Sequence, residues 1–270
     1  MGAEQGLNRA QVARALATSL VACVFAGACA GASAPASRVT LPAGARVLAR
    51  GSLAYAARAA GDAIVTIELE ERFALVVRDP ATGRERRRVD LGPAERDLVA
   101  LAVAGDRAWV GGDDRAVRTI DLASGEVVAT WPVGADVTAL RWLAPGWLAI
   151  GDATGVVCLR RVADAALVQC AVLAAGPIAA LDGGGGLTVV AGGARSTWTV
   201  PALAATAPAP PPSWRGKPVA IDGRRVVVGG EVVAALGERV RSIEVGPEGE
   251  LIVAAWIARL DDPSVIALPQ

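Results

Sequence analysis

Two cysteines in the middle of the chain, Cys158 and Cys170, are the residues whose types and spacing point most directly to chemistry. They lie on either side of a predicted turn near Asp164, in two short apolar segments that together resemble an antiparallel hairpin. Directly opposed residues of such a hairpin have Cα atoms about 4.5–5.5 Å apart, which is within disulfide range. We therefore predict a disulfide between Cys158 and Cys170. Two small apolar residues packed on one face of a sheet are the alternative.

The N-terminal segment differs in composition from the rest of the chain. Arg9 and Arg14 precede an apolar run of small residues, 15–30, and a Ser/Ala/Pro-rich segment follows it. This is the layout of a secretory signal peptide followed by a flexible tether. We therefore expect an exported protein.

Two cysteines within this run, Cys23 and Cys29, have a further meaning. Leu20-Val-Ala-Cys23 and Ala26-Gly-Ala-Cys29 both resemble the lipobox of bacterial lipoproteins, whose cysteine receives a diacylglycerol. The resemblance implies lipidation of Cys29 or Cys23 and a place in the bacterial cell envelope, in the periplasm or as an outer-membrane lipoprotein. Ordinary signal cleavage, which would discard both cysteines, is the alternative.

The charge balance excludes several classes of function. The chain has 27 basic and 27 acidic side chains and no histidine. Without histidine there is no His-based triad and no His metal site. Zero net charge removes the attraction on which non-specific nucleic-acid binding depends. We expect no metal, no cofactor, no nucleic-acid partner and no catalytic residue.

Two further groups of charged residues have both a functional and a structural interpretation. Four aspartates beside glycines could form a ring of metal-binding carboxylates, but we favour repeated turn chemistry. They are Asp62, Asp106, Asp182 and Asp222. The arginine run 84–88 could bind anions, but we favour protection of an outer strand against pairing with other chains.

The elements that position these residues come from a repeat of about 40 residues. Its clearest copy contains four strand-like runs joined by tight turns: Val99–Val103, Arg107–Gly112, Val117–Asp121 and Glu126–Trp131. A unit this short cannot bury both faces of its own sheet, so it must stack against copies of itself. The sequence therefore predicts an all-β fold, a single β-propeller of about six (five to seven) four-stranded blades.

Strand-like runs that could form the first and second strands of each blade recur along the body of the chain. The predicted first strands begin near Ser52, Val99, Val137, Ile178, Val219 and Val240. The fifth blade, Lys217–Glu238, has room for about three strands and is predicted to be truncated. We expect Val39–Leu41 to close the ring beside Ser264–Leu268, since pairing of the chain ends removes exposed edges. The predicted organisation is a signal peptide (1–30), a tether (31–45) and the propeller (46–270).

The second repeat resembles the WD-repeat family. The similarity rests on Gly111-Gly-Asp-Asp-Arg-Ala-Val-Arg118 and on Ile120-Asp121-Leu-Ala-Ser-Gly125-Glu126, in which Ile120 occupies the place of the family's tryptophan. The family's Gly-His pair is missing, so its His–Asp hydrogen-bond network cannot form here. Asp79-Pro-Ala-Thr-Gly83 also resembles repeats of quinone-dependent propellers, but the docking tryptophan is displaced.

The resemblance implies a non-catalytic scaffold for protein–protein interaction, expected to be a monomer. By analogy with WD repeats, the contact surface is placed at Asp113, Asp114, Arg115, Asp136, Asp152 and Trp142. Trp131 and Trp214 also lie near predicted turns, where a partner could reach them. The alternative is a propeller enzyme, either a quinone-dependent dehydrogenase or a lactonase-like hydrolase, with an axial active site. A single asparagine, Asn8, argues against a lactonase-like cage.

Overall fold

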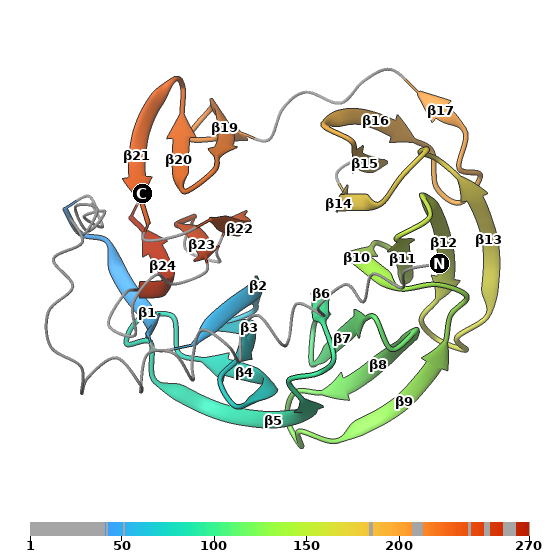
Figure 1. The fold of residues 1–270 in the computed structure, drawn as a ribbon, viewed down its shortest axis with the longest axis horizontal. Helices are drawn as coiled ribbons and strands as arrows, with labels where there is room; N and C mark the ends of the chain where they lie inside the picture. Colours follow the sequence, from blue (N-terminus) through green and yellow to red (C-terminus); the bar gives the residue numbers. More distant parts are fainter. Residues whose placement is uncertain are drawn as a thin grey trace, which may run out of the picture. The chain divides into compact units, whose positions relative to one another are not determined.

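The computed structural model describes residues 41, 43–50, 52–183, 186–206, 213–236, 239–245, 249–255 and 263–269. These residues form 24 strands in six antiparallel four-stranded sheets, all within the unit Arg38–Gln270 (Figure 1). The sheets are the blades of a six-bladed β-propeller, as the sequence predicts. Within the described ranges, no helix has the length and apolar character that crossing a membrane requires.

The first three blades follow the repeat closely. Blade 1 contains β2 (Leu53–Ala60), β3 (Ala63–Leu69), β4 (Arg72–Arg78) and β5 (Glu85–Pro93). Blade 2 contains β6 (Leu98–Ala104), β7 (Arg107–Gly112), β8 (Ala116–Asp121) and β9 (Val127–Pro132). Blade 3 contains β10 (Val137–Leu143), β11 (Trp147–Asp152), β12 (Val156–Arg161) and β13 (Leu167–Val172).

The remaining blades are less regular. Blade 4 contains β14 (Ile178–Gly183), β15 (Leu187–Ala191), β16 (Ala194–Trp198) and the two-residue β17 (Ala205–Thr206). Blade 5 contains the two-residue β18 (Ser213–Trp214), β19 (Lys217–Asp222), β20 (Arg225–Val228) and β21 (Glu231–Ala235). Blade 6 contains β22 (Val240–Val245), β23 (Leu251–Ala255), β24 (Pro263–Leu268) and β1 (Arg46–Arg50).

Two details of the predicted ring are wrong. Arg46–Arg50 takes the closing place predicted for Val39–Leu41 and pairs with β24 in register Arg46↔Ala267, while Val39 and Thr40 lie outside the described residues. Gly44, at φ +80°, turns the chain just before this strand, whose Leu48 and Ala49 are buried. In blade 5, the strand at Lys217 lies second in the sheet because β18 precedes it, so the blade has four strands and not three.

Apolar side chains fill the space between neighbouring blades. Five apolar clusters are formed by the described residues, and they join blades 1–2, 2–3, 3–4, 5–6 and 6–1. Trp109, for example, is buried between blades 2 and 3. The packing leaves no space at some glycines: a Cβ on Gly112 would clash with the carbonyl oxygen of Asp97. Stacking of adjacent sheets is thus the main source of stability.

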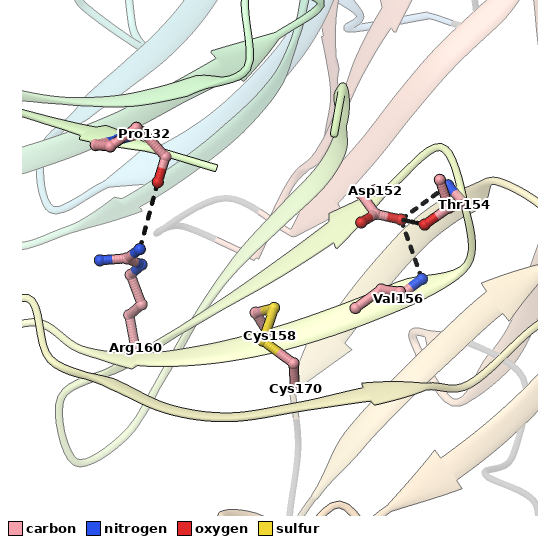
Figure 2. The surroundings of a disulfide bond; sticks show 7 residues. All are labelled: Pro132, Asp152, Thr154, Val156, Cys158, Arg160 and Cys170. Atoms are coloured by element: carbon pink, nitrogen blue, oxygen red, sulfur yellow. Dashed lines mark hydrogen bonds between the residues drawn. A yellow bond between two sulfur atoms is a disulfide. The ribbon is translucent and has the colours of Figure 1, made fainter. Parts of the chain in front are cut away.

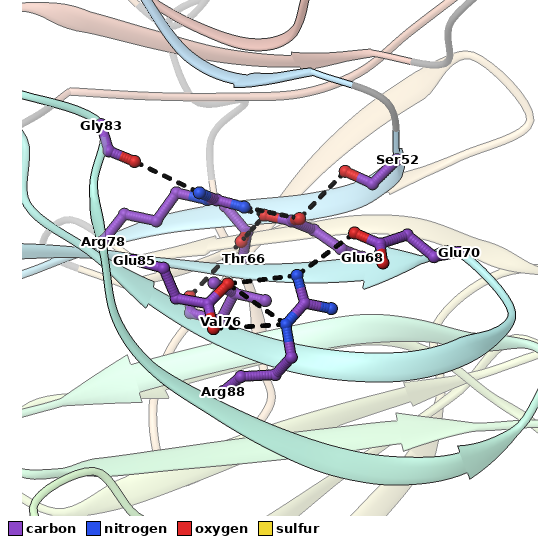
Figure 3. A network of polar contacts seen from close by, with 9 residues as sticks. All are labelled: Ser52, Thr66, Glu68, Glu70, Val76, Arg78, Gly83, Glu85 and Arg88. Atoms are coloured by element: carbon purple, nitrogen blue, oxygen red, sulfur yellow. Dashed lines mark hydrogen bonds and ion pairs between the residues drawn. The ribbon is translucent and has the colours of Figure 1, made fainter. Parts of the chain in front are cut away.

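Blade 1 contains a buried polar network in addition to its apolar core (Figure 3). The Glu68 side chain is fully buried and accepts hydrogen bonds from both ends of the Arg78 fork, at 2.9 Å from Nε and 2.8 Å from Nη2. The hydroxyls of Ser52 and Thr66 donate to the same carboxylate. Arg78 also donates to the Gly83 carbonyl at 3.2 Å. All four lone-pair directions of the carboxylate are thereby used.

The network sets the charge state of Glu68. Burial by itself raises the pKa of Glu68, but the hydrogen bonds and charge of Arg78, with the two hydroxyls, lower it more strongly. The net pKa therefore lies below the ordinary value of a glutamate. In blade 1, Arg78 comes directly before Asp79, as Ile120 comes directly before Asp121 in blade 2. Arg78 therefore occupies the position of the WD-repeat tryptophan in its blade. Blade 1 thus has a histidine-free polar network, which the sequence did not reveal.

Candidate interaction surface

Five of the predicted contact residues lie at one end of the propeller. The pairs Leu98↔Gly112 and Val137↔Asp152 place the β7–β8 and β11–β12 loops beside the starts of the innermost strands. We call this end the loop face and define it by its residues: Asp113, Asp114, Arg115, Asp136 and Asp152. The two loops and the β9–β10 connection therefore form one surface across blades 2 and 3.

An ion pair joins the two blades on the loop face. Arg115 Nε lies 3.1 Å from Asp136 Oδ1, and both side chains are substantially exposed. Backbone hydrogen bonds fix the same region, from Val133 N to the Arg115 carbonyl at 2.9 Å and from Ala153 N to the Asp136 carbonyl at 3.0 Å. The loops are therefore held in place by the scaffold, which is how propellers and similar folds present binding residues.

The carboxylates of the loop face differ in availability. Asp114 contacts Arg118 closely and lies 3.6 Å from Arg96, so its charge is neutralised internally. Asp152 Oδ1 accepts hydrogen bonds from the backbone and hydroxyl of Thr154 and from Val156 N, and so holds its own turn (Figure 2). Asp113 is exposed and has no side-chain partner among the described residues.

The predicted tryptophans do not lie on the loop face. Trp142 is on β10 near its far end, paired with Leu148, and lines a cavity in the channel at the opposite end of the propeller. Trp131 and Trp214 are buried, and Trp214 Nε1 donates to the Gly249 carbonyl at 2.8 Å. These two side chains pack between blades because burying their apolar surface lowers the free energy of the folded protein.

Sequence reasoning missed a ring of charges in the channel. Five innermost strands have a bulge near their start, and the third residue after it occupies the same place in each blade. The residues at this place are Arg58, Ala102, Arg141, Asp182 and Glu244. Figure 1 shows their strands β2, β6, β10, β14 and β22 around the centre. Because the bulge is at the same place in all five strands, these positions align in the sequence without a gap, but the sequence does not show that the strands meet around one channel.

The channel charges neutralise one another. Arg141 lies 3.4 Å from Glu244 of blade 6 and 3.4 Å from Asp182 of blade 4, and Arg58 lies 3.6 Å from Glu244. Burial lowers the pKa of Arg58, with Glu244 opposing the effect and Arg141 adding to it. The adjoining cavity, lined also by Trp142, has a volume of about 80 Å³, enough for a few water molecules but not for a drug-sized ligand.

The structure joins Cys158 and Cys170 in a disulfide between β12 and β13 (Figure 2). The two residues are directly opposed in the ladder, with Cα atoms 4.1 Å apart. On β12, the strand of Cys158, Arg160 Nη2 lies 3.4 Å from the Pro132 carbonyl of blade 2.

The arginine run 84–88 is on β5, the outer strand of blade 1, where Arg86 pairs with Asp62 and Asp79. Both features are thus parts of the outer half of their blades.

Comparison with solved structures agrees with this architecture. The structure of U3-55K aligns with a TM-score of 0.66 at 12% identity, covering 85% of this chain and 99% of that chain. The WD40 repeats of RRP9 align with the same score and identity, covering 86% and 99%. A chain of the mitotic checkpoint complex aligns with a TM-score of 0.55 at 14% identity, covering 76% and 74%.

No protein-family model matches the chain, and no curated protein matches it in sequence. At these identities the structural likeness defines the fold alone. The chain is a six-bladed β-propeller with the WD40-repeat fold.

Proposed function

We propose that this protein is a non-catalytic scaffold that binds a protein partner through the loop face. The observation that supports this most is the exposed charge of Asp113, Arg115 and Asp136 on loops that backbone hydrogen bonds hold rigid. Charged groups on a fixed loop steer and orient a partner without requiring the loop to be ordered on binding. The partner is expected to present charges of both signs.

The channel favours a scaffold over an enzyme with an axial active site. Its four charged residues are already paired with one another, at distances of 3.4–3.6 Å. A general acid or base must come within hydrogen-bond reach of a substrate, and the adjoining cavity of about 80 Å³ is small for a substrate. These charges are better explained as ion pairs that join blades 1, 3, 4 and 6.

Replacing Asp113 by lysine is expected to abolish capture of the partner. The reversed charge would oppose a complementary basic group, and it changes no contact within the propeller. The measurement is a pull-down with the full chain from a cell-envelope fraction. Asp106→Lys is the matched control, since Asp106 is an exposed aspartate at the other end of blade 2. A partner that binds wild type and both variants equally would contradict the assignment of the loop face.

We further propose that the protein is exported and anchored by a lipid at Cys29 or Cys23, both of which lie outside the described residues. The lipobox-like segments support this. Intact-mass measurement of the mature protein is expected to give a chain that starts at one of these cysteines and carries acyl chains. Cys29→Ser and Cys23→Ser, made separately, identify the modified residue. A mature chain that starts at Ala30 or later without an acyl group would disprove the anchor.

A further inference from the structure

The cavity in the channel has more positive than negative charge in its walls. The charged groups that line it are the guanidinium groups of Arg58 and Arg141 and the carboxylate of Glu244. Asp182, the fourth charged residue of the ring, lies 3.4 Å from Arg141, but its side chain is 53% exposed and it is not part of the lining. The described residues that line the cavity therefore carry one net positive charge.

Arg58 has a hydrogen-bond donor that the described part of the chain does not use. Its Nη1 donates to the Ala57 carbonyl at 2.9 Å. Its Nε is buried and has no acceptor among the described residues, since Glu244 Oε2 is 3.6 Å away. A buried N–H group without an acceptor is costly, so this position favours an acceptor from outside the chain.

Arg141, on the innermost strand of blade 3, is held only by long contacts. Its Nη1 lies 3.5 and 3.4 Å from the two oxygens of Glu244, and its Nη2 lies 3.4 Å from Asp182. Charge-assisted hydrogen bonds of this kind are usually about 2.7–2.9 Å long. Glu244 therefore does not satisfy either arginine fully, and both can donate to a further oxygen.

The cavity has room for a small ion. Its volume is about 80 Å³, and one water molecule needs about 10–15 Å³ on the same measure. Ala102 forms part of the wall because blade 2 has a methyl group where four other blades have a charged side chain at the ring position. The space is therefore sufficient for an ion of the size of formate, acetate or bicarbonate.

We propose that this cavity binds a small planar oxyanion with one negative charge, the chemistry that formate, acetate and bicarbonate share. One such ion balances the net charge of the walls. Its oxygens accept hydrogen bonds from Arg58 Nε and from the Arg141 guanidinium, whose planar forks match the geometry of a carboxylate. The inference does not rest on the proposed scaffold function, because it concerns the channel and not the loop face.

The bound ion joins parts of the chain that are far apart in sequence. Arg58 belongs to blade 1, Arg141 to blade 3 and Glu244 to blade 6. An ion that binds the folded ring and not the unfolded chain stabilises the ring as its concentration rises. Binding is therefore expected to raise the unfolding temperature as well as to change the surroundings of Arg58.

The test is a titration of the ¹⁵N-labelled full chain with sodium formate, which replaces sodium chloride at constant ionic strength and pH. The NMR signal of the Arg58 Nε–H group is identified by its loss in Arg58→Lys. In wild type this signal is expected to shift and to reach a plateau. Acetate and bicarbonate are titrated in parallel to show which of them binds most tightly, and benzoate, which is too large for the cavity, is expected to leave the signal unmoved.

Two variants of the cavity wall are expected to change the affinity in opposite directions. Arg58→Gln removes a donor and a positive charge, and it should abolish the rise of the unfolding temperature with formate. Glu244→Gln removes the negative charge, and it should lower the dissociation constant for formate about tenfold. Arg161→Gln is the matched control, since Arg161 is an exposed arginine of blade 3 that pairs with Asp164, and it should respond as wild type does.

An Arg58 Nε–H signal that none of the three anions shifts to a plateau would overturn the proposal and would mean that water alone occupies the cavity. So would weaker binding of formate by Glu244→Gln than by wild type. A response that Arg161→Gln loses as completely as Arg58→Gln would also overturn it, because the effect would then not be specific to the cavity. None of these results affects the loop face, whose partner binding is measured with Asp113→Lys.

Discussion

Replacing Glu68 by alanine is expected to destabilise the propeller by about 3–5 kcal/mol. The substitution leaves the Arg78 guanidinium, which is largely buried, without its counter-charge, and it removes the acceptor of Ser52 and Thr66. The uncompensated buried charge is the larger part of this loss, since an unpaired neutral donor costs about 1–3 kcal/mol and Thr66 Oγ1 keeps the Val76 carbonyl as an acceptor at 3.4 Å. Equilibrium unfolding in urea, with the slope m compared between variant and wild type, measures the change.

Two variants show whether the loss comes from the unpaired charge. Glu70→Ala removes an exposed ion pair with Arg88 and is expected to change stability by less than about 1 kcal/mol. Glu68→Leu/Arg78→Met removes both buried charges and is expected to cost much less than Glu68→Ala. If the double variant were as unstable as Glu68→Ala, the pairing of these charges would not be what stabilises blade 1.

The same network predicts a pH dependence. Because the pKa of Glu68 is lower in the folded state than in the unfolded chain, the carboxylate contributes stability above its unfolded pKa, which is about 4.3. That contribution is lost as the pH falls through the folded pKa. The stability difference between wild type and Glu68→Leu/Arg78→Met should therefore shift in favour of the double variant below about pH 4.

Removing the disulfide is expected to be the next largest change, about 3 kcal/mol for Cys158→Ala/Cys170→Ala. The bond closes a loop with a sequence separation of 12, and a loop of this length restricts the unfolded chain by about that amount. Urea unfolding under non-reducing conditions measures the difference from wild type.

Reduction provides the control for this prediction. Dithiothreitol should lower the unfolding midpoint of wild type to near that of the double variant and leave the variant itself unchanged. Equal midpoints for wild type and variant in the absence of reductant, or a free thiol at Cys158, would contradict a stabilising disulfide.

Features set by local chemistry could be predicted from the sequence. Asp121 Oδ1 accepts hydrogen bonds from the amides of Ala123 and Ser124, and Gly125 takes φ +80°, so the hairpin loop is specified by the residues within it. The predicted first strands of blades 3, 4 and 6 begin where the structure begins them, at Val137, Ile178 and Val240. The strand-like apolar runs themselves placed these three starts, since the spacing between blades is not equal.

Features that depend on contacts between strands or between blades could not be predicted. The channel ring brings together Arg58, Arg141 and Glu244, which are far apart in the sequence and meet because blades 1, 3 and 6 surround one channel. Arg78 lies just before a turn and gives no sign that Glu68 is buried beside it, because the two are brought together by pairing of β3 with β4. Trp142 lies far from Asp113 because opposite ends of a strand face opposite ends of the propeller.

The pairing of β1 with β24 has a consequence for the order in which the fold can be completed. Of the described strands, β1 leaves the ribosome first and β24 leaves it last. β24 lies between β1 and β23, so until it arrives blade 6 has two separate unpaired edges, and the apolar cluster of Leu48 and Ala49 lacks Val265 and Ala267. The other blades can form from neighbouring segments as they are made. Closure of the ring must wait for the end of synthesis, and this long-range step is expected to be the slowest in folding.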